Sequence, residues 1–362
     1  MTDSLLDRPM AGAADVAAIE AALARLLDTA RDVILLQGEA IVALEAAARG
    51  LGRPGSRALN IVTGPYGAMF GRWLAAGGTE VTEIATPFDQ VVRADAVAAA
   101  LARTPVDVVS IVHAEAATGG ANPLDEIAPL VAASGALLVV DAVASVGAHL
   151  VPPDTWGADI VVIGPQKALA GPAGVSAAVV SARAWRALED NPAAPRDSYL
   201  SLLDIKHSWL DTGRRALPGY AASLETFALR EALNRVADEG LPAVIRRHRA
   251  AAAATRAGLS ALGLRPWIAA DADAAAVTTT FAAPDGQSAG EFAAAAHAAG
   301  ATVTAPAPGP LAAHTLRVGH TGRAATLETA RAELTALAAA LGVPPGPALT
   351  AASDAVAGLE PR

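Results

Sequence analysis

Two ionisable residues follow short apolar segments in the middle of the chain. Asp141 comes directly after 137–140, and Lys167 comes shortly after 160–163. Segments of this length, rich in Val, Ile and Leu and bounded by Gly and Pro, are typical of strands buried on both faces of a parallel sheet. We therefore expect Asp141 and Lys167 to lie near each other at the carboxyl edge of that sheet, where α/β proteins bind ligands.

A carboxylate and an amine in this arrangement suit the chemistry of pyridoxal. Lys167 would form a Schiff base with the aldehyde, and Asp141 would keep the pyridine nitrogen protonated so that the ring accepts electrons. The same two residues also fit a structural ion pair at a strand end, and the residue types alone leave both interpretations open.

The segments around this pair alternate between two patterns. Further strands are predicted where apolar residues run together, at 33–36, 59–62, 106–112 and 175–180. Helices are predicted where apolar residues recur at helical spacing, at 15–31, 41–49, 224–238 and 242–262. This alternation favours an α/β fold with an open, mostly parallel sheet and right-handed connections.

The length of 362 residues is sufficient for a large core and two domains. We expect a large pyridoxal-binding domain at 15–241 and a small C-terminal domain at 242–341, joined by the long helix that starts at 242. Residues 1–14 are small and polar, and residues 342–362 are rich in Pro, Gly and Ala. Both ends are therefore predicted to be loose.

Composition excludes several classes of function. The net charge is −9, and the one basic cluster, 246–249, fits a solvated helix face, so nucleic acid is not expected as the main partner. No apolar segment is long enough to span a membrane, and the first residues lack the pattern of a signal peptide, so a cytoplasmic location is expected. The chain has no cysteine, which excludes disulfides and thiolate metal sites, and no metal is predicted.

The turn after the first predicted strand is a candidate anion site. Gly38, Glu39 and Ala40 lead into a helix, and a glycine turn at a helix N-terminus readily binds an anion. Glu39 would repel a phosphate dianion there, in a partly buried site, by several kcal/mol at order of magnitude. A carboxylate at this position also suits a helix cap, and the residues leave both roles open.

The pattern around Asp141 and Lys167 resembles the class V aminotransferases of PLP fold type I. It comprises Asp-x-Val-x-Ser from Asp141, a spacing of 26 residues to Lys167, and Gly-x-Gln-Lys-x-Leu-x-x-Pro-x-Gly around Lys167. The resemblance implies an aminotransferase with a large domain built on a seven-stranded, mostly parallel sheet and a smaller α+β C-terminal domain. It implies an amino donor and a 2-oxo acid as partners, and a homodimer or homotetramer with the site at the subunit interface. Cysteine desulfurases share this fold but need a cysteine that this chain lacks.

The resemblance also assigns roles to individual residues. Tyr66 would stack on the pyridine face, Thr118 would hydrogen-bond the ring substituents, and Arg317 would bind the amino-acid carboxylate with its planar guanidinium. The complete cofactor-binding set is Gly38, Glu39, Ala40, Tyr66, Thr118, Asp141, Val143, Gln166 and Lys167.

Roughly residues 17–341 are similar to the pyridoxamine–pyruvate transaminase branch of this family. That branch takes unphosphorylated pyridoxal and pyridoxamine as substrates instead of keeping pyridoxal 5′-phosphate as a fixed cofactor. Stretches that carry the similarity include Gly38-Glu39, Tyr66-Gly67, Gly164-Pro165-x-Lys167 and Arg317-x-Gly319-His320. The branch assignment agrees with Glu39, because a carboxylate accepts a hydrogen bond from a free 5′-hydroxyl.

The chain also departs from the family. Tyr220 stands where a threonine reaches the phosphate bound by the neighbouring subunit, Pro308 stands where a second arginine is expected, and the N-terminal segment with an active-site tyrosine is absent. Two alternatives therefore remain. One is an ordinary pyridoxal-phosphate-dependent alanine–glyoxylate or serine–pyruvate aminotransferase in which Glu39 only caps a helix. The other is a non-catalytic member of the family that acts as a binding protein.

Overall fold

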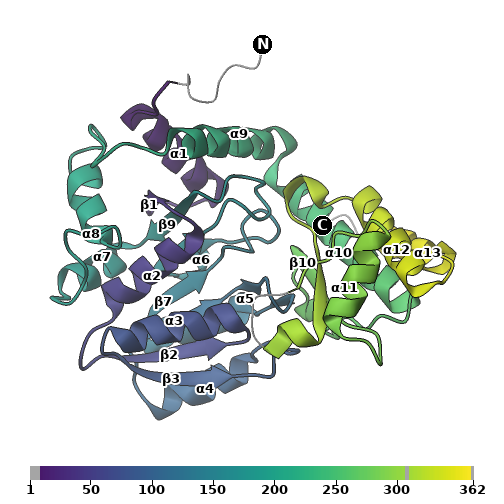
Figure 1. Cartoon of the computed structure of the whole chain (residues 1–362). Coiled ribbons are helices and arrows are strands. Elements are labelled where there is room, and N and C mark those ends of the chain that lie inside the picture. The colour runs from purple at the N-terminus through teal and green to yellow at the C-terminus, as the bar shows by residue number, and fades with distance from the viewer. Residues whose placement is uncertain (1–8, 306–309, 360–362) are drawn as a thin grey trace.

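The computed structural model describes residues 9–305 and 310–359 and consists of a large α/β domain beside a smaller domain (Figure 1). The large domain is built on one seven-stranded sheet, with the strand order β1-β9-β8-β7-β4-β2-β3. Its strands are β1 (Asp32–Gln37), β2 (Arg57–Val62), β3 (Glu80–Ala85), β4 (Val108–Val112), β7 (Leu137–Asp141), β8 (Ile160–Ile163) and β9 (Val175–Val180).

Five neighbouring strands of this sheet, β3, β2, β4, β7 and β8, run parallel to one another. At the other edge, β9 pairs antiparallel with both β8 and β1. The predicted α/β fold with a mostly parallel seven-stranded sheet is confirmed. All four residues of β8 are buried, which explains why the central strands read as continuous apolar segments without alternation.

Helices cover both faces of the sheet, and alternate residues of each strand supply the two cores. In β7, Leu138 and Val140 pack on one face, whereas Val139 packs on the other. The first face is covered mainly by α1 (Ala13–Leu26), α4 (Ala94–Arg103), α5 (Leu124–Ser134), α6 (Pro153–Trp156) and α9 (Ser223–Glu239). The second is covered mainly by α2 (Ala40–Leu51), α3 (Pro65–Ala76), α7 (Ala182–Glu189) and α8 (Leu202–Ile205).

The small domain begins with the long helix α10 (Leu241–Ala261) and contains an antiparallel pair, β10 (Thr278–Ala282) and β11 (Thr315–Gly319). Helices α11 (Ala289–Ala298) and α12 (Leu327–Leu341) pack with this pair around a separate core that includes Phe281, Phe292 and Leu334. Beside this pair, residues 301–304 form no strand of their own, and Thr304 makes a single bridge to Arg317 of β11.

The prediction of a loose tail at 342–362 is wrong for most of that segment. It contains α13 (Gly346–Ala357), in which Ala348 and Ala352 are fully buried in the core of the small domain. Alanine side chains are small enough to let α13 lie close against α10, so the composition that suggested a loose segment in fact supports helix packing. At the other end, α1 begins at Ala13, inside the predicted loose segment 1–14, of which residues 1–8 lie outside the described residues.

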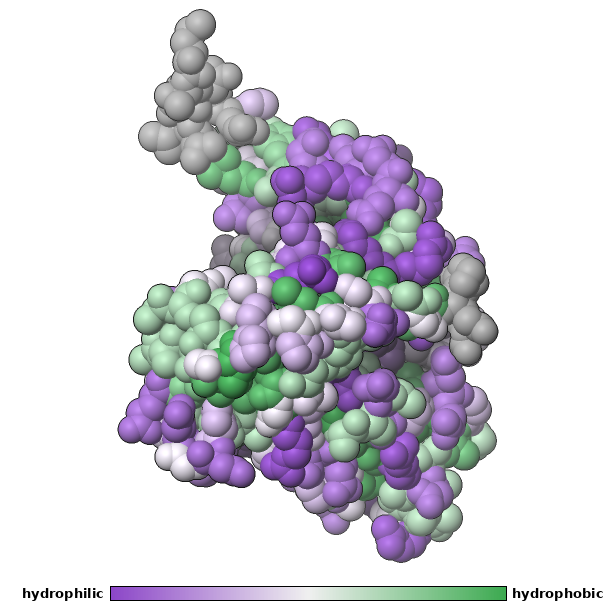
Figure 2. Space-filling view, turned by 90° about the vertical axis from the view of Figure 1, so that its right-hand side faces the viewer, coloured by the Kyte–Doolittle hydropathy of each residue, from purple (hydrophilic) through white to green (hydrophobic). Residues whose placement is uncertain are grey.

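The face that the small domain presents mixes hydrophilic and hydrophobic residues (Figure 2). Helices α12 and α13 are rich in alanine, which contributes hydrophobic surface without bulky exposed side chains. Within the described ranges, no helix has both the length and the apolar character needed to cross a membrane.

Two neighbouring histidines lie at the boundary between the two domains. His113 and His149 belong to the large domain, and their rings meet edge to face with centroids 5.4 Å apart. His149 Nε2 accepts a hydrogen bond from the backbone N–H of Ala276 in the small domain at 3.0 Å. Burial lowers the pKa of His113 to about 4 and that of His149 to about 3, so both rings are neutral in the folded protein near pH 7.

We predict that His149→Gln makes the protein less sensitive to acid. The unfolded chain takes up a proton on this histidine below about pH 6.5, whereas the folded protein does not, so the histidine lowers stability as the pH falls. As the pH falls from 6 to 4.5, the unfolding free energy of the variant minus that of the wild type should increase by about 1.4 kcal/mol for each pH unit. Urea titrations measure this difference, and the exposed His207→Gln serves as the control. An equal slope for both variants would contradict the prediction.

Candidate active site

Asp141 and Lys167 lie at the carboxyl edge of the central strands. Asp141 is the last residue of β7, and Lys167 is in the turn that follows β8. The Asp141 Oδ1 atom accepts a hydrogen bond from the backbone N–H of Val143 at 2.9 Å. Burial raises the pKa of Asp141 to about 6 against the effect of this hydrogen bond and of the positive charge of Lys167. The two residues therefore interact electrostatically, as expected from their positions after adjacent strands.

Lys167 lies in a strongly charged environment. Burial lowers its pKa, and the nearby positive charge of Arg317 lowers it further. The carboxyl groups of Glu39, Asp141 and Glu115 act in the opposite direction and raise the pKa of the amine. The amine is consequently easier to deprotonate than an ordinary lysine, the condition under which it acts as a nucleophile and proton carrier.

Glu39 closes the N-terminus of α2. It is the N-cap residue, and its Oε2 atom accepts a hydrogen bond from the backbone N–H of Ile41 at 2.8 Å. Its Oε1 atom accepts a second hydrogen bond from Gln166 Nε2, which comes from the turn next to Lys167. The carboxylate of Glu39 thus occupies the backbone N–H of Ile41, a donor that could otherwise bind an external anion at this helix end.

Close packing brings three more of the predicted residues together. A Cβ atom added at Gly164 would lie 2.6 Å from Val143, 2.7 Å from Gln166 Oε1 and 3.2 Å from the Cβ of Ala40. Only glycine therefore allows the turn after β8 to approach both α2 and the segment after β7. At Gly38 the backbone has a φ of 135°, a left-handed conformation that also favours glycine.

Tyr66 is in the first turn of α3, where it is half-buried. Burial raises the pKa of its hydroxyl, and the negative charge of Glu115 raises it further, whereas the positive charge of Arg317 lowers it. Thr118 is buried in the turn between the short strands β5 (Ala114–Glu115) and β6 (Gly120–Ala121), where its hydroxyl accepts from Gly120 N–H at 3.3 Å. The contacts of Tyr66 and Thr118 with a pyridine ring remain predictions.

Arg317 reaches the large domain from β11. Its Nε atom donates to Thr304 Oγ1 at 3.0 Å, and its Nη1 atom donates to the carbonyl oxygen of Ala116 at 3.2 Å. Two of its nitrogens are thus anchored, which orients the guanidinium beside the site. The position of the second family arginine, Pro308, lies outside the described residues.

Glu115 is a site residue that the sequence reasoning did not single out. It is fully buried, and its Oε2 atom has no hydrogen-bond partner within the described residues. Burial raises its pKa to about 8, and the negative charge of Asp141 adds to the effect. The sequence signal that could have identified it is an acidic residue among small residues directly after a buried strand.

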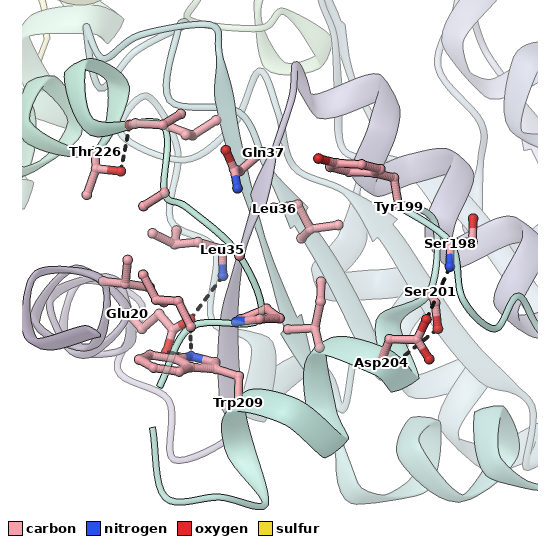
Figure 3. A pocket seen from close by; sticks show the side chains of 18 of the residues that line it. Glu20, Leu35, Leu36, Gln37, Ser198, Tyr199, Ser201, Asp204, Trp209 and Thr226 are labelled. Carbon is pink, nitrogen blue, oxygen red and sulfur yellow. Dashed lines mark hydrogen bonds between the residues drawn. The ribbon is translucent and has the colours of Figure 1, made fainter. Parts of the chain in front are cut away.

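A cavity of about 440 Å³ flanks the site on the side of the edge strand β1 (Figure 3). Gln37, the residue before Gly38, lines it together with Tyr199 and Trp209. The carboxylate of Glu20 lies at its wall and accepts hydrogen bonds from Trp209 Nε1 and Leu35 N–H. Asp141 and Lys167 do not line this cavity, so the chemistry belongs to the sheet edge beside it. Across residues 9–305 and 310–359, no cluster of three or more His, Cys, Asp or Glu side chains could hold a metal ion.

The geometry agrees with comparisons against known proteins. Residues 8–334 match the family described as aminotransferase class-V. The chain is 38% identical over 309 residues to the pyridoxamine–pyruvate transaminase of Mesorhizobium japonicum, covering 85% of this chain and 78% of that protein.

Solved structures show the same relationship. The crystal structure of pyridoxamine–pyruvate aminotransferase from Mesorhizobium loti superposes with a TM-score of 0.91 at 34% identity, covering 95% of this chain and 89% of the other. Ureidoglycine–glyoxylate aminotransferase from Bacillus subtilis gives 0.87 at 26% identity, with 98% and 94% covered. With a family match over most of its length and Asp141 and Lys167 at adjacent strand ends, the chain belongs to the class V aminotransferases.

Proposed function

We propose that this aminotransferase moves the amino group of pyridoxamine to a small 2-oxo acid such as pyruvate, and that it binds pyridoxal without a phosphate. The observation that carries the proposal is the position of Glu39, whose carboxylate is bonded to the N-terminus of α2 and to Gln166. Similarity to pyridoxamine–pyruvate transaminase over most of the chain supports the same substrate.

The charges around the site disfavour a phosphate dianion. The carboxylates of Glu39 and Asp141 act on Lys167, and Arg317 is the cation among the described residues that acts on it as well. A helix N-terminus stabilises an anion by only about 0.3–2 kcal/mol, which is too little to offset an adjacent carboxylate in a desolvated site. A neutral 5′-hydroxyl can instead donate a hydrogen bond to Glu39.

The side chains at the sheet edge fit the remaining part of a pyridoxal group. When bound, that group supplies an aldehyde carbon that takes up an amino group and a ring that withdraws electrons. Lys167, whose pKa is lowered by burial and by Arg317, loses its proton more readily than an ordinary lysine, which suits an amine that binds the group and then carries a proton. Asp141 is ionised above about pH 6, so its carboxylate holds a proton on the ring nitrogen.

Arg317 is the residue proposed to bind the carboxylate of the 2-oxo acid. Its guanidinium is oriented by Thr304 and by the carbonyl of Ala116, which limits the entropy lost when a planar carboxylate binds. One arginine matches an acceptor with a single carboxylate, such as pyruvate.

We also propose that the protein forms a homodimer or homotetramer with the site at the subunit interface. Large hydrophobic side chains are exposed next to the site, including Ile41 in the first turn of α2 and Tyr199 and Tyr220 near the flanking cavity. Tyr199 and Tyr220 are each 83% exposed. Gln37 Nε2 donates to the backbone oxygen of Tyr220 at 2.8 Å, so this surface is continuous with the strand that leads into Gly38.

One contact favours an ordinary phosphate-dependent aminotransferase instead. Glu39 bonds the N–H of Ile41 and therefore meets the definition of a helix cap. If capping is its whole role, the 5′ position of the ligand need not meet this carboxylate. The two functions differ in their preference for pyridoxal or its phosphate, which can be measured directly.

The amino transfer itself can be tested with purified protein. Pyridoxamine and pyruvate should be converted to pyridoxal and alanine in equal amounts, because the amino group and the carbonyl oxygen exchange places. Lys167→Ala should abolish the reaction, and Lys206→Ala, which removes the only other lysine of the chain, should leave it unchanged. Wild-type protein that fails to form both products would contradict the proposal.

We predict that cyanate, which reacts with neutral amines, modifies Lys167 before Lys206 at pH 8. The pKa of Lys167 is lowered by burial and by Arg317, whereas that of Lys206 is raised overall, because its partners Asp211 and Glu189 outweigh its partial burial. Arg317→Ala should slow the modification of Lys167 alone. Peptide mass spectrometry over time measures both rates, and equal rates in the wild type would disprove this ordering.

We expect Asp141→Asn to lower the rate of amino transfer by several orders of magnitude, because the ring nitrogen loses the charge that holds its proton. The ligand-free variant should be at least as stable as the wild type at pH 7. Its amide oxygen can still accept from Val143 N–H, and a buried acid whose pKa is raised from 3.8 to about 6 loses stability between those pH values. Stopped assays and thermal unfolding measure the two effects. Activity near that of the wild type would remove Asp141 from this role.

Glu39→Ser should shift the preference from pyridoxal towards pyridoxal 5′-phosphate. Serine retains a helix-capping oxygen but removes the negative charge that repels the dianion. Equilibrium dialysis with both ligands measures the preference. Glu45→Ser, which removes a carboxylate from the same helix but at a surface ion pair with Arg49, should leave the preference unchanged. Wild-type protein that binds the phosphate more tightly would identify Glu39 as a cap only.

A further inference from the structure

The helix that carries Tyr66 has no cap of its own. Its N-cap position is occupied by Gly64, which has no side chain to accept hydrogen bonds from the first turn of α3. The first N–H groups of any helix lack partners within the helix, and a buried helix end needs an acceptor from elsewhere.

The carboxyl group of Glu115, from a distant part of the sequence, lies against this helix end. The backbone N–H groups of Tyr66 and Gly67 lie near its carboxyl group and lower its pKa, and its Oε1 atom accepts a hydrogen bond from Ala117 N–H at 3.4 Å. A Cβ atom added at Gly64 would lie 2.3 Å from Glu115 Cδ and 2.4 Å from its Oε2 atom. The carboxyl group of Glu115 therefore fills the space that an ordinary capping side chain would occupy.

The residues after Glu115 are bound to the small domain. Ala116 accepts a hydrogen bond from Arg317 Nη1, and Ala117 accepts one from Thr280 Oγ1 at 3.0 Å. The carbonyl oxygen of Gly119 accepts from the N–H of Ala275 at 2.8 Å. The β5–β6 hairpin thus meets the start of α3 through Glu115 and binds the guanidinium of Arg317 through Ala116.

We propose that Glu115 is a positioning residue: by capping α3 from the β5–β6 hairpin, its carboxyl group holds the Tyr66 ring against the pyridine and fixes it relative to Arg317. The proposal rests on the proposed function, since Tyr66 matters in this way only if a pyridine ring binds. Glu115 acts through the backbone of Tyr66 and needs no contact with the substrate.

The charge state of Glu115 predicts different effects for its glutamine and alanine variants. Burial and the nearby charge of Asp141 raise its pKa to about 8, so the group is mostly a neutral acid at pH 7. Glutamine has nearly the same shape and retains the accepting oxygen, so Glu115→Gln should preserve the cap. Alanine has neither the shape nor the accepting oxygen of glutamate, so Glu115→Ala should release the first turn of α3.

Binding of pyridoxine, which has the ring but no aldehyde to react with lysine, tests the positioning of Tyr66. Measured by calorimetry at pH 7, the affinity should fall about tenfold in Glu115→Ala, as expected for the loss of a helix cap, and should stay within about twofold in Glu115→Gln. Ser288→Ala removes the cap of α11 in the small domain and serves as the matched control. It should lower the melting temperature without changing the affinity for pyridoxine.

A double variant separates capping from general damage. Gly64→Ser alone should impair folding and binding, because the new side chain collides with Glu115. Combined with Glu115→Ala, the serine gains space and supplies a local cap, so the double variant should bind pyridoxine more tightly than Glu115→Ala. No recovery in the double variant would overturn the proposal.

Two measurements do not require a bound ligand. Hydrogen exchange of the Tyr66 and Gly67 amides should accelerate in Glu115→Ala and not in Glu115→Gln. The melting temperature of Glu115→Gln should rise relative to that of the wild type from pH 5 to 8, because the folded wild type must retain a proton that the unfolded chain releases. Faster exchange with unchanged pyridoxine affinity would overturn the positioning role. Wild-type protein that does not bind pyridoxine would overturn the proposed function and with it this role, while exchange would still decide whether Glu115 caps α3.

Discussion

The free N–H groups at the starts of α2 and α3 need acceptors, and a carboxyl group of the chain itself lies at each of these helix ends. Glu39 accepts a hydrogen bond from the first turn of α2, and the carboxyl group of Glu115, the proposed cap of α3, lies against Gly64 at the start of that helix. Both helices start beside the carboxyl edge of the central strands, so these two contacts shape the site that holds Asp141 and Lys167. An external anion has correspondingly little to gain at α2, which explains why a neutral ligand group fits there better than a phosphate.

Burial also determines which ionisable groups of the site are charged at neutral pH. It lowers the pKa of Lys167 and raises those of Asp141 and Glu115, because every buried group is driven towards its neutral form. Asp141 remains ionised at neutral pH because its pKa reaches only about 6, whereas that of Glu115 reaches about 8. One carboxyl group can therefore serve as an electrostatic partner for a protonated ring while the other serves as a neutral structural acid.

The small domain completes the site through a few directed contacts. Arg317 is held by the hairpin that contains Glu115, and His149 accepts a hydrogen bond from Ala276 across the same boundary. These partly buried contacts link the placement of Arg317, the arginine proposed to bind a carboxylate, to the packing between the domains. The alanine-rich helices α12 and α13 form the outer part of this domain, away from the large domain (Figure 1).

The sequence alone determined the central strands and the residues that follow them. Strands buried on both faces must be continuously apolar, so β7, β8 and the positions of Asp141 and Lys167 could be predicted from composition and spacing. β3 was missed because it lies at the sheet edge and is largely exposed, and α13 was missed because alanine gives no strong periodic signal. Only the tertiary structure placed Glu115 against Gly64, residues about fifty positions apart, and Gln166 against Glu39. Contacts between distant segments depend on how the sheet and its helices pack, and no local pattern in the sequence encodes that packing.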